Sequence, residues 1–234
     1  MSSEQSLKKS IEHGRLFDSS VRARNAELEL CRRDPAYWLW NEQQYVKTRD
    51  ESRPDSPVRS FPDKRYLRQL LAVLHDPNIP IILVAKSRQL VVTWLLCAYF
   101  CWWARFVPNQ LLFIQSKKEE DAANLVFAKA PGMARIDFIE ENLPWWMRQD
   151  RITSMGQQIY QNGSKIWGIP QGSDIIRSYT GSALFSDEFA FQPFAEEAYK
   201  AAKPSCKKII GVSSANPGFF ARLGGFEKTR VGIS

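Results

Sequence analysis

The feature that most constrains the fold is an alternation of short, wholly apolar runs with longer segments of helical periodicity. Residues 79–84 form the first run, and a loop at 85–92 separates it from an apolar helical stretch at 93–106. Residues 111–114 repeat the pattern, with a helical segment at 117–129 behind them. Such short apolar runs are typical of strands buried on both faces of a sheet. Their alternation with helices predicts a parallel sheet with helices on both faces.

The rest of the chain continues this pattern. Residues 63–76 have the spacing of an amphipathic helix, and glycines separate alternating runs at 152–169, which predicts a small hairpin. Further strands are expected at 182–185 and 208–212, and further helices at 136–147 and 193–203. The expected fold class is therefore α/β, a three-layer αβα sandwich around a central, mostly parallel sheet.

The N-terminal quarter has a different composition. Residues 4–32 are rich in Arg, Lys and Glu and have only a weak apolar stripe, which predicts a peripheral helix. Residues 48–62 are polar and contain three prolines, which predicts a loop. We therefore divide the chain into a helical, lid-like extension with a linker at 1–59 and a core at 60–234.

Charge and cysteine content narrow the class of protein. The net charge of +7 favours a polyanionic partner such as nucleic acid, although a basic protein without such a partner would show the same surplus. The four cysteines form no C-x-x-C pair, so neither a disulfide framework nor a zinc site is expected. The longest apolar run, 91–104, is shorter than a bilayer span, and no signal peptide is expected.

The loop after the first apolar run occupies the place of a phosphate loop. The standard pattern, G-x-x-x-x-G-K-[ST], lies between a strand and a helix, whose N-terminus and backbone N–H groups hold phosphates. Thr93 keeps the hydroxyl that ligates Mg²⁺. Lys86 and Val91 replace the two glycines, and Val92 replaces the lysine. The candidate phosphate-binding residues are Lys86, Ser87, Arg88, Gln89, Leu90, Val91, Val92 and Thr93.

These replacements differ in their consequences. Because the loop wraps around a phosphate, Lys86 can supply positive charge from the other side, and Arg88 adds a second cation. Val91 is the harder problem, since glycine tolerates backbone conformations that a β-branched residue resists. We expect the loop either to adopt another conformation or to bind nucleotide weakly. Taken alone, the segment also fits a plain strand-to-helix connection with surface cations.

Two carboxylates follow a second buried strand. Asp187 and Glu188 come directly after the apolar residues 183–185. Acids at the end of a core strand are costly to bury unless they hold a cation or a hydrogen-bond network. In a nucleotide-hydrolysing site, Asp187 would hold Mg²⁺ and Glu188 would polarise the attacking water. The alternative is a strand end that simply emerges into solvent.

A third strand end carries small polar side chains. Ser214 and Asn216 follow the apolar residues 209–212, where they suit a sensor of the γ-phosphate. The sequence Asn-Pro-Gly at 216–218 is equally a turn signal in its own right. Because ligands bind beyond the carboxyl ends of parallel strands, all three strand ends are expected to converge on one crevice.

Taken in order, these segments resemble the N-terminal ATPase domain of tailed-bacteriophage large terminase subunits. The resemblance covers about residues 40–225, and Lys-Ser-Arg-Gln and Phe-Ser-Asp-Glu-Phe-Ala are its most specific parts. The segments that carry it are 61–69, 85–89, 184–190, 213–217 and 219–220. It implies a P-loop fold of the ASCE (RecA-like) type and Mg²⁺-dependent ATP hydrolysis coupled to translocation of double-stranded DNA into a procapsid.

The resemblance also implies partners and residue roles. The partners would be double-stranded DNA, the portal protein, the small terminase subunit and neighbouring copies in a ring on the procapsid, in the host cytoplasm. Lys86 would match a lysine shifted to the front of the loop, and Thr93 the hydroxyl on the Mg²⁺ side. Asp187 would match the Mg²⁺ aspartate and Glu188 the catalytic glutamate. Residues 214–216 would match the element that couples hydrolysis to DNA movement.

Two further roles follow from the resemblance. Tyr66, with Gln69, falls where the family contacts adenine. Arg177, ten residues before Asp187, is a candidate for the arginine finger that a neighbouring subunit inserts to stabilise charge on the transferred phosphoryl group. Arg88 is the competing candidate, acting within its own subunit.

Other functions compete with this one. The Val91-Val92 pair motivates a degenerate P-loop scaffold that binds DNA or portal protein without efficient turnover, whereas the intact Asp187-Glu188 pair argues against it. A helicase-like translocase would need a second RecA-like domain, for which the chain is too short. The family's nuclease domain is not expected here. Candidate DNA contacts, each equally explained as solvated charge, are Arg22, Arg24, Arg32, Arg33, Lys117 and Lys118.

Overall fold

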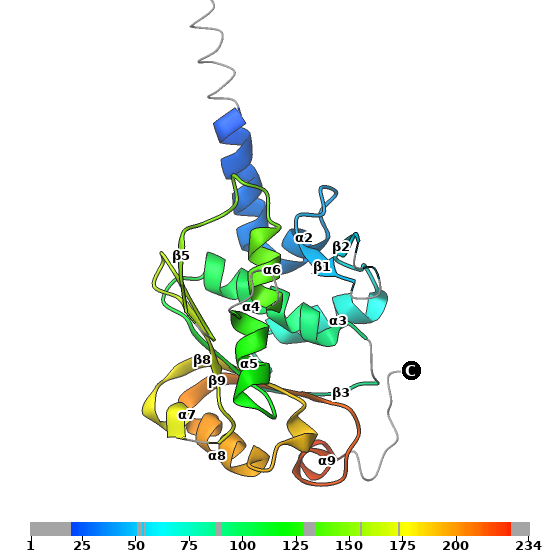
Figure 1. The fold of residues 1–234 in the computed structure, drawn as a ribbon, viewed down its shortest axis with the longest axis vertical. Helices are drawn as coiled ribbons and strands as arrows, with labels where there is room; N and C mark the ends of the chain where they lie inside the picture. The colour runs from blue at the N-terminus through cyan, green and yellow to red at the C-terminus, as the bar shows by residue number, and fades with distance from the viewer. Residues whose placement is uncertain are drawn as a thin grey trace, which may run out of the picture.

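A seven-stranded sheet forms the middle of the molecule (Figure 1). The computed structural model describes residues 20–50, 53, 55–87, 90–128, 134–154, 156–172 and 174–225. In spatial order the strands are β3 (Ile81–Ala85), β9 (Cys206–Ser213), β8 (Gly181–Asp187), β4 (Leu111–Gln115), β7 (Lys165–Ile169), β6 (Gln157–Tyr160) and β5 (Arg151–Ser154). The first five are parallel to one another, and β6 and β5 are antiparallel additions. The predicted fold class is confirmed.

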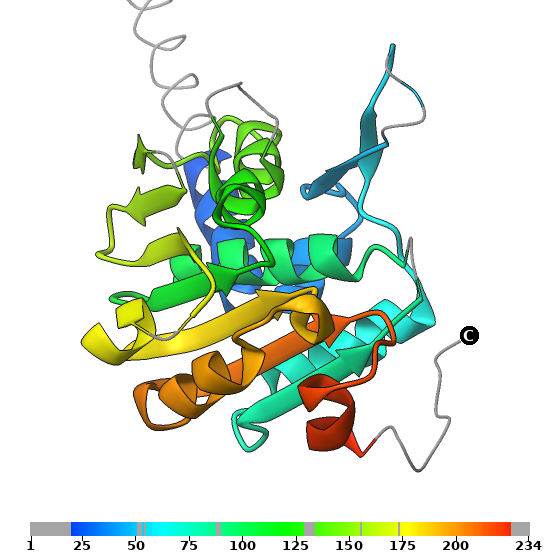
Figure 2. The ribbon, with the colours of Figure 1, turned by 60° about the horizontal axis from the view of Figure 1, so that its bottom comes forward.

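Helices cover both faces of the sheet (Figures 1 and 2). One face carries α2 (Pro35–Trp40), α3 (Arg65–His75), α4 (Val92–Phe106), α5 (Glu119–Val126) and α6 (Arg135–Glu141). The other carries α7 (Asp174–Ser178), the 3-10 helix η1 (Phe189–Phe191), α8 (Ala195–Ser205) and α9 (Phe219–Gly224). Strand β4 shows why both faces need cover: Leu112 and Ile114 enter one core, and Phe113 enters the other.

Helix α4 is the centre of the larger core. It is apolar around most of its circumference because the sheet, α2, α3 and α6 enclose it. Its Phe100 meets Phe185 of β8 at a ring distance of 6.1 Å. Its Trp102 donates an indole hydrogen bond of 2.8 Å to the carbonyl of Cys31, in the helical segment 20–33. The N-terminal extension therefore packs onto the core that follows it.

The described helices are all too short or too polar to cross a lipid bilayer, including the 15-residue α4. Burial inside the protein accounts for the apolar character of α4, as the sequence predicted.

Two segments differ from their predictions. The expected loop at 48–62 includes an antiparallel pair, β1 (Lys47–Arg49) and β2 (Val58–Ser60), whose polar residues gave no apolar alternation. The expected hairpin at 152–169 is three strands, and β7 joins β4 in the central sheet. Pairing with β4 was invisible to sequence periodicity because it joins residues more than 50 positions apart.

A buried lysine closes the carboxyl end of α3. Lys208, on β9, is 5% exposed, and its Nζ donates hydrogen bonds of 2.6 Å to the carbonyl of Leu74 and 2.7 Å to that of Asp76. The last carbonyls of a helix have no partner within the helix, and a cation there also complements the helix dipole. Burial lowers the pKa of Lys208. The ammonium thus links the end of α3 to the edge of the sheet.

Replacing Lys208 by Met should lower the free energy of unfolding by about 2 kcal/mol, because two charge-assisted hydrogen bonds disappear and the carbonyls stay buried. Chemical denaturation measures the change. Lys207→Met is the matched control, since Lys207 is exposed on the same strand and should change stability little. Equal losses in both variants would contradict the capping role.

Candidate functional site

Three strand ends meet at one edge of the sheet. Strand β9 lies between β3 and β8, so Ala85 pairs with Ser213, and Asp187 pairs with Val212. The backbone N–H of Lys86 donates to the carbonyl of Ser213 over 2.9 Å. The structure therefore brings together the loop after β3, the acidic pair after β8 and the polar segment after β9.

Thr93 and Asp187 form the innermost part of the site. Thr93 is on the first turn of α4, and its hydroxyl lies 3.3 and 3.4 Å from the two carboxylate oxygens of Asp187. Asp187 is only 8% exposed, and burial raises its pKa, while Lys86 and Arg135 act to lower it. A hydroxyl and a carboxylate are the oxygen donors that Mg²⁺ prefers. A buried carboxylate with these neighbours suits a bound cation.

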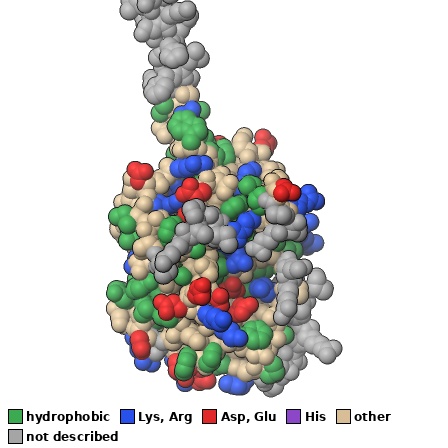
Figure 3. Space-filling view, viewed as in Figure 1, with side chains coloured by type: hydrophobic (Ala, Val, Ile, Leu, Met, Phe, Trp, Pro, Cys, Tyr) green, Lys and Arg blue, Asp and Glu red, His purple; other side chains and the backbone are tan. Residues whose placement is uncertain are grey.

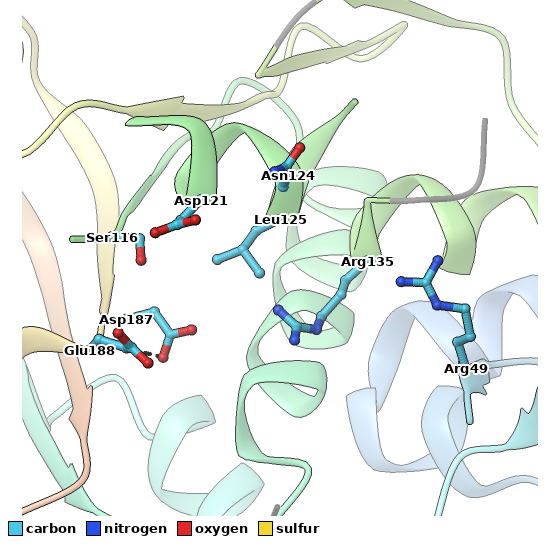
Figure 4. A pocket seen from close by; sticks show the side chains of 8 residues that line it. All are labelled: Arg49, Ser116, Asp121, Asn124, Leu125, Arg135, Asp187 and Glu188. Carbon is cyan, nitrogen blue, oxygen red and sulfur yellow. Dashed lines mark hydrogen bonds between the residues drawn. The ribbon is translucent and has the colours of Figure 1, made fainter. Parts of the chain in front are cut away.

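Glu188 faces a different environment from Asp187. It is exposed, and it begins η1 in the left-handed region with φ 51° and ψ 39°. This turn separates the two acids: Asp187 packs against α4 and Glu188 faces open space (Figure 4). Both line a cavity of about 450 Å³. The cavity is lined by Arg49, Ser116, Asp121, Asn124, Leu125, Arg135, Asp187 and Glu188.

Two arginines of this cavity were missed from the sequence. Arg135 begins α6, and its guanidinium reaches toward Asp187 from across the cavity (Figure 4). It lies 5.7 Å from the ring of Trp94, next to Thr93 on α4. Arg49, on β1, lies 5.9 Å from the ring of Phe138. No motif surrounds either arginine, so only the packing of α6 on α4 and β1 reveals them.

Val91 adopts the conformation that its side chain resists. Its φ of 57° and ψ of 9° are left-handed, and its carbonyl accepts the first α4 hydrogen bond from Leu95 N–H at 3.0 Å. The loop therefore keeps at Val91 the turn that a glycine would make, at a cost of about 1–2 kcal/mol. Val92 is 3% exposed, so its side chain belongs to the core and only its backbone faces the loop. Ser87 is exposed, and Leu90 is half-buried.

The predicted adenine contacts differ in placement. The hydroxyl of Tyr66, on α3, donates to the carbonyl of Leu90 over 3.0 Å, which is a contact with the loop itself. Gln69 is exposed on the same helix. Arg88 and Gln89 lie outside the described residues.

The third strand end is fastened to the acidic one. The amide of Asn216 donates to the carbonyl of Ala190 over 2.9 Å, and the hydroxyl of Ser213 accepts from the Ala190 N–H over 3.2 Å. Ala190 is two residues after Glu188, and Ser214 is half-buried nearby. The amide of Asn216 is therefore engaged in joining β9 to η1.

Arg177 lies away from its own site. It is exposed on α7, which packs on α8 against the sheet face opposite α4 (Figure 1). From this position it faces outward, where a neighbouring molecule has access to it. Its assignment as a finger that acts on another subunit stays a prediction.

The candidate DNA contacts are dispersed. Arg32 and Arg33 each form an ion pair of 2.7 Å with Glu29, and Arg24 stacks on Trp145 at 4.7 Å. Lys117 and Lys118 are exposed. Among the described side chains on the face in Figure 3, basic and acidic groups are intermingled. The net positive charge does not mark one DNA surface there.

The sheet order and the site define the class of fold. The strand bearing the phosphate loop is separated by one strand, β9, from the strand bearing the acidic pair. Helices cover both faces, and the polar groups gather at the carboxyl ends of the strands. This is the fold of the P-loop nucleoside triphosphatases.

Solved structures with this fold are ATPase domains of phage large terminases. The large terminase of bacteriophage HK97 aligns with a TM-score of 0.53 and 12% identity over 73% of this chain and 36% of its own. The large terminase of a thermophilic bacteriophage aligns with 0.52 and 12%, over 71% and 43%. The Thermus phage P74-26 ATPase domain aligns with 0.51 and 14%, over 74% and 73%.

These similarities concern the fold. The chain spans less than half the length of the first two of these terminases. No protein-family model and no curated protein sequence matches it.

Asp187→Asn should stabilise the metal-free protein at neutral pH by roughly 1 kcal/mol, because it removes a buried charge from a functional site. The pKa of Asp187 is raised in the folded state, so the carboxylate is ionised at neutral pH and protonated on acidification. The gain should therefore vanish at acid pH. Denaturation at both pH values measures it, with the exposed Glu188→Gln as control; a loss of stability at neutral pH would refute the expectation.

Proposed function

We propose that this domain is a Mg²⁺-dependent ATPase motor of the terminase type, which couples ATP hydrolysis to translocation of double-stranded DNA into a procapsid. The observation that carries the proposal is the contact of Thr93 with the buried Asp187, beside Glu188 and the loop that begins at Lys86. A phosphate loop and an acidic strand end that meet in this way form a site for a metal–nucleotide complex. The terminase fold supports the choice of motor.

The residues divide the chemistry among them. The first turn of α4 and Lys86 would hold the phosphates through backbone N–H groups and a positive charge. Thr93 and Asp187 would hold Mg²⁺, which supplies positive charge to the phosphate oxygens when bound. Glu188, exposed in the cavity, would orient the attacking water and accept its proton.

Arg135 would complete the positive side of the site. Its guanidinium reaches toward Asp187 across the cavity, and its charge already acts on the pKa of that acid. A cation in this position stabilises the charge that develops on the transferred phosphoryl group. We assign Arg135 this role within its own subunit, in addition to the two earlier candidates, Arg88 and Arg177.

The bonds to Ala190 suggest how hydrolysis reaches the rest of the domain. Ser213 and Asn216 hold the residue two positions after Glu188, so a movement of η1 would be transmitted to β9 and to α9 beyond it. We propose that this link couples the site to DNA. The portal protein, the small terminase subunit and further copies of the chain in a ring are the partners that a motor of this type requires.

A catalytically inactive scaffold is the second candidate. The strained turn at Val91 and the buried Val92 favour it, because both depart from a standard phosphate loop. Calorimetry with an ATP analogue and Mg²⁺ separates the two functions. An absence of heat at millimolar nucleotide would favour the scaffold, which would bind DNA or portal protein without turnover.

Glu188→Gln should abolish Mg²⁺-dependent phosphate release, by about 10²–10⁴-fold, while ATP-analogue binding persists, because the change removes a proton acceptor and leaves the phosphate loop intact. Phosphate release is measured with DNA present. Glu197→Gln, exposed on α8, is the control and should keep wild-type turnover. Hydrolysis by the wild type no faster than by Glu188→Gln would overturn the enzyme.

Arg135→Ala should slow turnover by about 100-fold and leave ADP binding nearly unchanged, since the guanidinium acts on charge that appears during phosphoryl transfer. Arg135→Lys keeps the charge and should recover part of the rate. Single-turnover hydrolysis and ADP titration measure the two quantities. A loss of ADP affinity equal to the loss of rate would instead assign Arg135 to ground-state binding.

A further inference from the structure

The phosphate loop is tied to α3 by one hydrogen bond. The hydroxyl of Tyr66 donates to the carbonyl of Leu90 over 3.0 Å, between residues 24 positions apart. Tyr66 is in the first turn of α3, and the next residue, Leu67, is fully buried in the main core. The donor is therefore held by a rigid helix. The acceptor belongs to the residue immediately before the left-handed Val91.

This bond acts on the torsion angle that is strained. The φ angle of Val91 is a rotation about its N–Cα bond, and the carbonyl of Leu90 lies in the peptide plane on one side of that bond. The Tyr66 hydroxyl fixes the orientation of this plane. On the other side, the carbonyl of Val91 accepts from the Leu95 N–H at 3.0 Å. Both peptide planes that flank Val91 are thus restrained.

Without such restraints Val91 would leave this conformation. A β-branched residue in the left-handed region is a conformational outlier, because its side chain crowds the backbone. Glycine needs no restraint there. Among the described residues only four non-glycine residues have positive φ, and Val91 is the one in the phosphate loop.

We propose that Tyr66 is a positioning residue that holds the phosphate loop in its left-handed turn. The hydrogen bond from α3 does for Val91 what conformational freedom does for glycine. The tether is a property of the unliganded protein, and its effect on nucleotide rests on the ATPase function proposed above. A loop held ready binds phosphate without first being reorganised.

The test is a double-mutant cycle between Tyr66→Phe and Val91→Gly. Tyr66→Phe removes only the hydroxyl, and Val91→Gly removes the strain. Tyr99→Phe is the matched control, because the hydroxyl of Tyr99 donates to the carbonyl of Leu74 over 3.2 Å, between α4 and α3 but away from the loop. Val91→Asn, which also tolerates the left-handed region, replaces Val91→Gly if the glycine variant does not fold.

The first readout needs no nucleotide. Hydrogen exchange of the Leu95 amide, which depends on the Val91 carbonyl, should be about tenfold faster in Tyr66→Phe and unchanged in Tyr99→Phe. In the Val91→Gly background, adding Tyr66→Phe should change this rate little. Unchanged protection in Tyr66→Phe, or equal effects of that substitution in both backgrounds, would overturn the proposal.

The second readout uses ATP and Mg²⁺. Tyr66→Phe should raise KM about fivefold and leave kcat within about twofold, and Val91→Gly should restore KM. A fall in kcat with unchanged KM would contradict a positioning role in phosphate binding. If the wild type binds no nucleotide, the ATPase function fails while the exchange experiment still decides whether the tether exists.

Discussion

The burial of Asp187 beneath the first turn of α4 is the constraint on which the site depends. A carboxylate at 8% exposure is costly unless cations and hydrogen-bond donors surround it. Thr93, Lys86 and Arg135 come from three different elements, and each acts on this one side chain. The apolar enclosure of α4 matters for the same reason, because it fixes the helix whose first turn carries Thr93.

Backbone strain gathers at the same edge of the sheet. Val91 and Glu188 are both left-handed without being glycine, and each conformation costs about 1–2 kcal/mol. Residues in such conformations persist only where the surrounding structure determines them. Here the surroundings are the Tyr66 bond on one side and the link from Asn216 and Ser213 to Ala190 on the other. The core therefore maintains two turns that aim Thr93 and Glu188 differently.

The sequence was sufficient for the elements buried on both faces. The central strands and α4 follow from apolar runs, and the acidic pair follows from its position after such a run. Periodicity reports burial but not the partner across the interface. For that reason Arg135, which approaches Asp187 from 52 positions earlier, and the pairing of β7 with β4 were found only in three dimensions. The polar β1 and β2 carried no apolar signal at all.

A motif is a summary of physical requirements, and this loop meets them with other residues. The requirements are a left-handed turn before the helix, a cation beside the phosphates and a hydroxyl on the metal side. Val91 makes the turn against its own preference, Lys86 supplies the cation from the front of the loop, and Thr93 keeps the hydroxyl. Because conformational freedom at the turn has been lost, some other group must hold it. The Tyr66 hydroxyl is positioned to do so, which makes α3 part of the nucleotide site through the backbone of Leu90.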